Sequence, residues 1–203
     1  GIGYNMVPPV SYQLTGNVNL ADYLGDNAQR PVTVELRTPG TQTVLGTQTF
    51  TLSNQGSFVL DTTLFGTVDV ALTAPGFLRK VLPNVNLSSN PTISTSLING
   101  DIDLDNSVTI FDYIQLSWNF DQNVGDEGVN ALADLDGDGS ITIFDYIELS
   151  GNFDMNEEDP LFYQVSPAGV PRSYSDLDRD GAVTIFDYII LSSNFDFEGQ
   201  LGD

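Results

Sequence analysis

The sequence predicts an α+β chain of two regions, a seven-stranded antiparallel β-sandwich followed by three repeats of a loop and a helix. Seven short runs of alternating or β-branched residues lie between residues 10 and 97, and three copies of one Asp-rich pattern follow them. The charge also changes near Gly100: residues 1–100 hold 5 acidic and 4 basic residues, whereas residues 101–203 hold 23 and 2. A chain of 203 residues is expected to form one or two domains. We therefore predict an arm (1–9), a sandwich (10–100) and a repeat region (101–203).

The N-terminal arm is a short apolar stretch set apart from the first strand. Pro8 and Pro9 separate it, because proline interrupts the pairing of a strand. It is either an edge strand or frayed arm of its own sandwich, or a strand donated to a neighbouring subunit by β-augmentation. Donation would join copies head to tail into a filament. The residues assigned to this assembly element are Gly1, Ile2, Gly3, Tyr4, Asn5, Met6 and Val7.

The sandwich is predicted from seven runs separated by turn sequences such as Asp-Asn, Pro-Gly and Asn-Gln-Gly. The predicted strands are 12–20, 32–37, 43–52, 57–60, 68–73, 79–87 and 92–97. The number of strands is similar to that of immunoglobulin-like and transthyretin-like sandwiches. The sequence pattern of segments such as Leu14-Thr-Gly-Asn-Val18 resembles that of carboxypeptidase-regulatory-like domains. That resemblance implies a fold and no particular activity.

Each repeat begins with a 12-residue segment whose spacing fits a calcium loop. Calcium binds six to eight oxygen atoms, and such a loop supplies them from positions 1, 3, 5, 7, 9 and 12. Positions 1, 3, 5 and 12 are Asp in all three copies, and four clustered carboxylates repel one another unless a cation lies among them. Position 6 needs a positive φ, which Gly139 and Gly181 adopt freely and Asn106 adopts with some strain. The predicted ligands are Asp101, Asp103, Asp105, Ser107, Thr109 and Asp112; Asp134, Asp136, Asp138, Ser140, Thr142 and Asp145; and Asp176, Asp178, Asp180, Ala182, Thr184 and Asp187.

These segments resemble the type I dockerin repeat, in which an EF-hand-like loop is followed by a single helix. The resemblance covers residues 101–121, 134–154 and 176–196, and it implies three Ca²⁺ ions per chain and a cohesin-like protein as partner. Dockerins usually contain two such repeats, whereas this chain contains three. At loop positions 10 and 11, where dockerins use small hydroxylated residues to recognise cohesin, this chain has Ile-Phe in every copy.

A helix of two to three turns is predicted after each loop, from the shared run Ile-Phe-Asp-Tyr-Ile-x-Leu-Ser. Its apolar positions nearly encircle it, as Phe111, Ile114 and Trp118 lie on one face and Tyr113 and Leu116 flank that face. Most of these side chains are expected in a core. The remainder are expected to contact other repeats, the sandwich or a second chain.

The composition limits the possible functions and indicates that the chain is not an enzyme. There is no His and no Cys, which excludes His-assisted nucleophiles and zinc sites built from His or thiolate. Six basic residues against 28 acidic ones argue against nucleic acid and anionic membrane surfaces as partners, and no apolar run is long enough for membrane insertion. Calcium loops suit an exported protein, because extracellular calcium fills even weak sites. We expect an extracellular or cell-surface protein in its mature form, without a signal peptide.

Three functional hypotheses follow. The first is a non-enzymatic, calcium-stabilised structural protein that self-assembles into a fibre, sheath or surface layer. The second is a dockerin-type anchoring module that binds a cohesin-like receptor. The third is a carbohydrate-binding protein that uses its sandwich, which would need an exposed aromatic platform, whereas the single tryptophan, Trp118, lies in a repeat helix.

Overall fold

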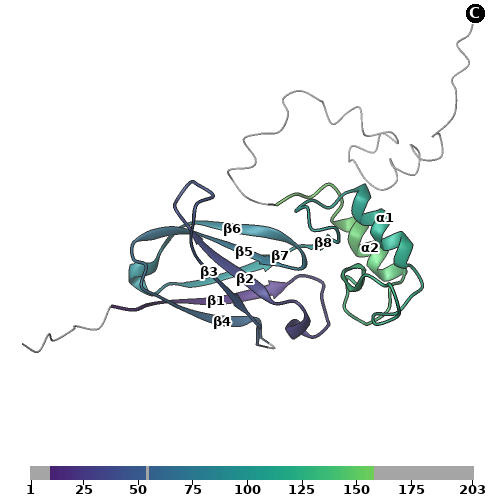
Figure 1. The fold of residues 1–203 in the computed structure, drawn as a ribbon, viewed down its shortest axis with the longest axis horizontal. Helices are drawn as coiled ribbons and strands as arrows, with labels where there is room; N and C mark the ends of the chain where they lie inside the picture. The colour runs from purple at the N-terminus through teal and green to yellow at the C-terminus, as the bar shows by residue number, and fades with distance from the viewer. Residues whose placement is uncertain (1–9, 54, 158–203) are drawn as a thin grey trace, which may run out of the picture.

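A computed structural model describes residues 10–53 and 55–157 (Figure 1). The arm (1–9) and the third repeat (176–196) lie outside these residues. None of the helices in the described part is both long and apolar enough to span a membrane. The elements are β1 (Tyr12–Leu20), η1 (Asn27–Gln29), β2 (Val32–Arg37), β3 (Val44–Phe50), β4 (Ser57–Thr62), β5 (Thr67–Ala74), β6 (Gly76–Asn86), η2 (Leu87–Ser89), β7 (Thr92–Leu97), β8 (Asn99–Asp101), α1 (Ile110–Asn119), η3 (Ala131–Ala133) and α2 (Ile143–Gly151).

The strands form two sheets that enclose one apolar core. One sheet has the order β4-β1-β7 and the other β3-β2-β5-β6-β8. Side chains alternate between the two faces of a strand, so Leu14, Val18 and Leu20 of β1 all point into the core while Asn17 and Asn19 face solvent. Alternation along β1 therefore decides which of its side chains enter the core.

The predicted fold class, a seven-stranded antiparallel sandwich followed by three EF-hand-like loop–helix repeats, is wrong. The described residues contain eight strands and two α-helices, and β1 pairs in parallel with β7. The missed strand, β8, has the sequence Asn-Gly-Asp, which lacks apolar alternation and is typical of a turn. It forms because the chain passes the edge of β6, where Phe77 pairs with Asn99 and Gly76 with Asp101.

A second apolar core lies at one end of the sandwich, where α1 and α2 lie side by side (Figure 1). The aromatic rings of Tyr113 and Tyr146 meet edge to face between the helices, with centroids 5.9 Å apart. The buried members of this core are Leu78, Ile102, Val108, Leu116, Ala133, Leu135, Ile141 and Leu149. Because Leu78 belongs to β6, this core includes part of the sandwich.

The second Asp-rich loop contacts the segment that follows β1. The backbone N–H of Leu24 donates to the carbonyl of Asp136 at 2.7 Å. The buried guanidinium of Arg30 donates through Nη2 to the carbonyl of Ala131 at 2.8 Å, and it lies over the ring of Tyr23. These bonds satisfy carbonyl groups of the second loop and of η3, which precedes it, with donors from the segment that follows β1.

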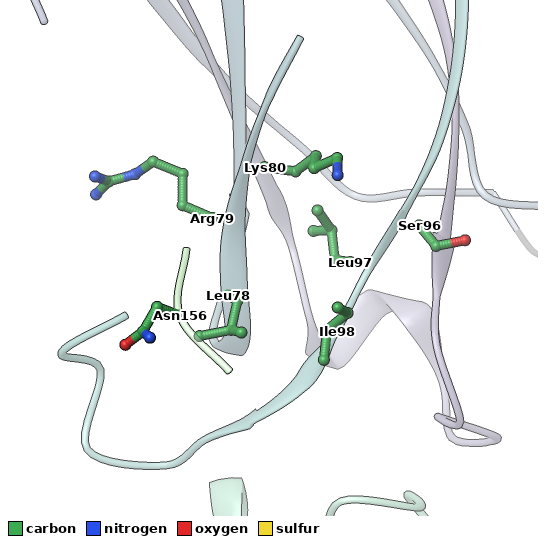
Figure 2. Close-up of a pocket in the computed structure, with 7 residues that line it drawn as sticks. All are labelled: Leu78, Arg79, Lys80, Ser96, Leu97, Ile98 and Asn156. Atoms are coloured by element: carbon green, nitrogen blue, oxygen red, sulfur yellow. The ribbon is translucent and has the colours of Figure 1, made fainter. Parts of the chain in front are cut away.

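The first Asp-rich loop contacts β6. The side chain of Arg79 forms an ion pair with Glu157 at 3.0 Å, and its backbone N–H donates to the side chain of Asn106 at 3.3 Å. Figure 2 shows this junction, where Leu78 and Arg79 lie near Ile98 and Asn156. The segment after α2 is thereby joined to the sandwich as well.

We predict that Gly137→Ala lowers the free energy of unfolding by about 1–3 kcal/mol more than Gly128→Ala does. Both glycines have a positive φ, +75° and +83°, so both changes carry a similar backbone strain. A methyl group on Gly137 would lie 2.5 Å from the ring of Tyr23 and 2.6 Å from the nitrogen of Gly25, whereas one on Gly128 would meet open space. Urea denaturation in calcium measures the difference. Equal losses would show that the contact between loop and sandwich adds no stability.

Candidate metal centre

The structure gathers the first three aspartates of each described loop. Oxygen atoms of Asp101, Asp103 and Asp105 lie within 4.8 Å of one another, and the same holds for the group Asp134, Asp136 and Asp138. These are the residues predicted for positions 1, 3 and 5. The residues predicted for the third loop lie outside the described part of the chain, namely Asp176, Asp178, Asp180, Ala182, Thr184 and Asp187.

Local hydrogen bonds orient these carboxylates in the same way in both loops. In the first loop, Asp103 Oδ1 accepts from the N–H of Asp105 at 3.2 Å, and Asp105 Oδ1 accepts from the N–H of Ser107 at 2.8 Å. The corresponding distances in the second loop, for Asp136 and Asp138, are 3.0 Å and 2.8 Å. Such turns around Asp and Asn come from side chains that bond the backbone two residues further on.

Both loops use the left-handed backbone region twice. The predicted positive φ at position 6 is confirmed, at 65° for Asn106 and 96° for Gly139. Position 4 also has a positive φ, at 68° for Leu104 and 75° for Gly137, which the sequence analysis missed. The glycine in the second loop was the available signal, because glycine adopts this region without a Cβ clash.

The aspartates at position 12, Asp112 and Asp145, are fully buried and bind backbone N–H groups. Asp112 Oδ1 accepts from Ile102 at 2.6 Å and Asp103 at 3.1 Å, and its Oδ2 accepts from Thr109 at 2.7 Å. Asp145 accepts in the same way from the second loop at 2.6, 3.2 and 2.7 Å. A carboxylate has about four lone-pair sites, so these bonds leave capacity for a metal ion. Ligation by Asp112 and Asp145 stays a prediction.

Thr109 and Thr142, predicted at position 9, begin the two helices as N-caps. Their hydroxyl oxygens accept from the N–H of Phe111 and of Phe144, each at 3.2 Å. Together with the aspartate three residues later they form capping boxes. The pattern Thr-x-x-Asp before an apolar run is a known signature of this motif, so the sequence contained the signal. Metal ligation by both threonines, and by the carbonyls of Ser107 and Ser140, stays a prediction.

Burial raises the pKa of the first aspartate in each described loop. Burial, with the nearby carboxylates of Asp112, Asp105 and Asp103 adding to it, raises the pKa of Asp101 to about 7. Burial likewise raises the pKa of Asp134 to about 6. Within the described residues, Asp101 Oδ1 is also a buried oxygen without a hydrogen-bond donor. A buried carboxylate with no positive partner is costly, and a hard divalent cation bound by oxygen atoms would remove that cost.

The two loops pair with each other's helices through reciprocal backbone bonds. After α2, the N–H of Asp154 donates to the carbonyl of Val108 at 2.9 Å, and the N–H of Val108 donates to Met155 at 2.8 Å. After α1, the N–H of Asp121 donates to Ile141 at 2.8 Å, and Ile141 donates to the carbonyl of Gln122 at 2.9 Å. Each loop is thus held by the segment that leaves the other helix.

Comparison with known proteins finds similarity only at the level of structure. No family model and no curated protein matches the sequence. The fold is similar to a chain from an N-terminal interface mutant of the type II cohesin–X–dockerin complex of Acetivibrio cellulolyticus, with a TM-score of 0.60 and 20% identity. A C-terminal interface mutant of the same complex gives a TM-score of 0.59 at 20% identity. Each match covers 73% of this chain and 99% of the other.

This likeness establishes a shared fold with a component of a cohesin–X–dockerin complex. The sandwich accounts for less than half of the 203 residues, so a match over 73% of the chain extends beyond it. At 20% identity the comparison shows the fold and leaves the activity to be argued from the residues.

Proposed function

We propose that this protein is a non-enzymatic, extracellular binding module of a cohesin–dockerin type assembly, whose calcium-loaded loop–helix pair binds a cohesin-like β-sandwich. The observation behind this proposal is the pair of matched helices, each of which begins at an acidic loop and exposes large apolar side chains. The likeness to chains of the cohesin–X–dockerin complex supports the same class of function.

The acidic loops support calcium as the ion. The described ligands are all oxygen donors, and no His or Cys occurs in the chain, so the donor set suits a hard cation. The raised pKa values of Asp101 and Asp134 follow from burial without a counter-charge. Three ions would also offset six of the 22 net negative charges.

The helices support a protein partner. Phe111 in α1 and Phe144 in α2 both occupy position 11 of their loops, in the first turn of each helix, and each side chain is 61% exposed. Trp118 is 70% exposed two turns beyond Phe111 in α1, and Ile147 is 56% exposed one turn beyond Phe144 in α2. Large apolar side chains grouped at a surface mark interaction sites, because leaving them in water forgoes the free energy of burial.

Self-assembly through Gly1 to Val7 stays a prediction, because that arm lies outside the described residues. The exposed helical side chains do not require a second copy of this chain as partner. A cohesin-like partner accounts for them together with the fold.

Calcium binding is tested by metal analysis of the full chain after loosely bound ions are removed. We expect close to three Ca²⁺ ions per chain, one for each Asp-rich loop. The double variant Asp134→Asn, Asp138→Asn should lose one ion, because it removes two charged ligands from one loop. The control variant Asp61→Asn, on an exposed part of β4, should keep all three. A value near zero, or bound transition metal, would refute the assignment.

The pKa shifts predict how stability depends on pH when calcium is chelated. Because the folded state raises the pKa of Asp101 from 3.8 to about 7, the folded protein binds more protons than the unfolded chain between these values. The free energy of unfolding in chelator should therefore fall as the pH rises through this window. Calcium should reverse the trend, since it binds the ionised carboxylates. Denaturation at a series of pH values checks this, and Asp101→Asn should flatten the slope in chelator whereas Asp61→Asn should not.

Partner binding is tested with a panel of immobilised type I and type II cohesins, by surface plasmon resonance in calcium. Phe111→Ser combined with Phe144→Ser should weaken binding by roughly 2 kcal/mol or more, about thirtyfold in Kd, as expected for apolar residues at the centre of an interface. Phe65→Ser is the matched control, because Phe65 is 76% exposed on the sandwich. Binding of a dockerin instead of a cohesin, or an equal loss from the Phe65 change, would contradict the assignment of the helices as the binding face.

A further inference from the structure

A cleft of about 400 Å³ opens at the end of the sandwich that adjoins the second loop. Its volume falls within the range of about 300–1,000 Å³ typical of small-molecule sites. Two segments that are separate in the sequence form its walls: β1 with the turn that follows it, and the turn before β4. The polar and apolar side chains that define it are Asn17, Asn19, Tyr23, Leu24, Asn27 and Gln55.

Four of these side chains are amides, and three of them are held in place by the protein. Asn17 Nδ2 donates to the carbonyl of Gln55 at 2.8 Å, Asn27 Nδ2 donates to the carbonyl of Ser53 at 3.2 Å, and Asn19 Nδ2 donates to the hydroxyl of Ser96 at 3.3 Å. Each bond uses one of the two N–H donors of its amide. An amide also accepts through its carbonyl oxygen, so this set suits ligands whose hydroxyl groups both donate and accept.

The charge of the cleft selects against anions. Among the described residues, eleven line the cleft, and these include no Lys or Arg and one carboxylate, Asp26. The whole chain has a net charge of −22, so a phosphate or an acidic sugar would be repelled. A single carboxylate, one oxygen of which accepts from the N–H of Ala28 at 2.9 Å, does not form a cation cage either.

An apolar group completes the cleft. Leu24 is 88% exposed, although leucine is a residue that usually lies inside a protein. Its exposed methyl groups offer a surface for the C–H face of a ligand. A neutral compound with hydroxyl groups at its edge and an apolar face matches both features of the lining.

We propose that this cleft binds a neutral oligosaccharide. The amides of Asn17, Asn19 and Asn27 bond the sugar hydroxyls, and Leu24 contacts the face of one ring. The site is separate from the helices of the proposed cohesin-binding face, so a module that binds both would attach a protein assembly to a polysaccharide.

The cleft is also connected to the second loop. Leu24 donates its N–H to Asp136, and a Cβ on Gly25 would lie 2.9 Å from the carbonyl oxygen of Gly137. The wall of the cleft therefore contacts the loop that we propose to bind calcium. On that proposed function, calcium fixes the position of Leu24 without contacting the sugar.

The experiment titrates the full chain in calcium with neutral cello-, xylo- and manno-oligosaccharides and with an acidic oligogalacturonide, using isothermal calorimetry and amide NMR shifts. We expect a neutral oligosaccharide to bind and the acidic one to be rejected. Leu24→Ala and Asn19→Ala should each weaken binding about tenfold, which corresponds to the loss of about 1.4 kcal/mol. The matched controls Leu45→Ala and Gln48→Ala alter exposed residues of β3 and should bind as the unchanged chain does.

Three results would overturn the proposal: no shift at millimolar neutral sugar, preference for the acidic sugar, or an equal effect of the control variants. Full sugar affinity in chelator would overturn the link to the second loop. Leu24→Ala should leave cohesin binding unchanged, so the sugar-binding proposal and the cohesin-binding proposal are tested independently. Loss of both activities in this one variant would contradict their separation.

Discussion

The loop–helix region depends on one buried carboxylate in each unit, Asp112 and Asp145. Each accepts three backbone N–H groups, two from the start of its loop and one from the N-cap threonine of its helix. Hydrogen bonds to an ionised acceptor are roughly twice as strong as those between neutral groups. An unsatisfied buried N–H costs about 1–3 kcal/mol, so these residues determine where the loop closes and where the helix begins. The other carboxylates are brought together as a consequence.

Both described loops are joined to the sandwich through the short strand β8. Asp101, the first aspartate of the first loop, is the last residue of β8 and pairs with Gly76 of β6. Asn99, in the same short strand, donates to the carbonyl of Leu135 at 3.1 Å and to the carboxylate of Glu148 at 3.0 Å. Burial raises the pKa of Glu148 to about 7, which reflects how closely the second helix is packed against the sandwich. Hydrogen bonds therefore join the sandwich to the second loop and α2, in addition to the chain that connects them.

The two loops differ at position 4, and the difference fits their surroundings. Gly137 touches the backbone of Gly25, a contact that a side chain would prevent. Leu104 occupies the same backbone conformation in the first loop but is 54% exposed, and the strain of a positive φ in leucine is tolerated there. Helix capping and contact with the sandwich thus impose separate demands on the same twelve residues.

The sequence by itself determined the features that depend on neighbouring residues. Alternation placed β1 and β2 at their observed bounds, and the spacing of the aspartates identified the side chains that meet in each described loop. It did not determine β8, the parallel pairing of β1 with β7, or the convergence of amides beside Leu24. Each of these joins segments that lie far apart in the chain, and no local pattern records which segment will be adjacent. Periodicity and ligand spacing are properties of a few consecutive residues. Edge pairing and cleft formation depend instead on how the two cores pack together, so only the tertiary structure decided these two features.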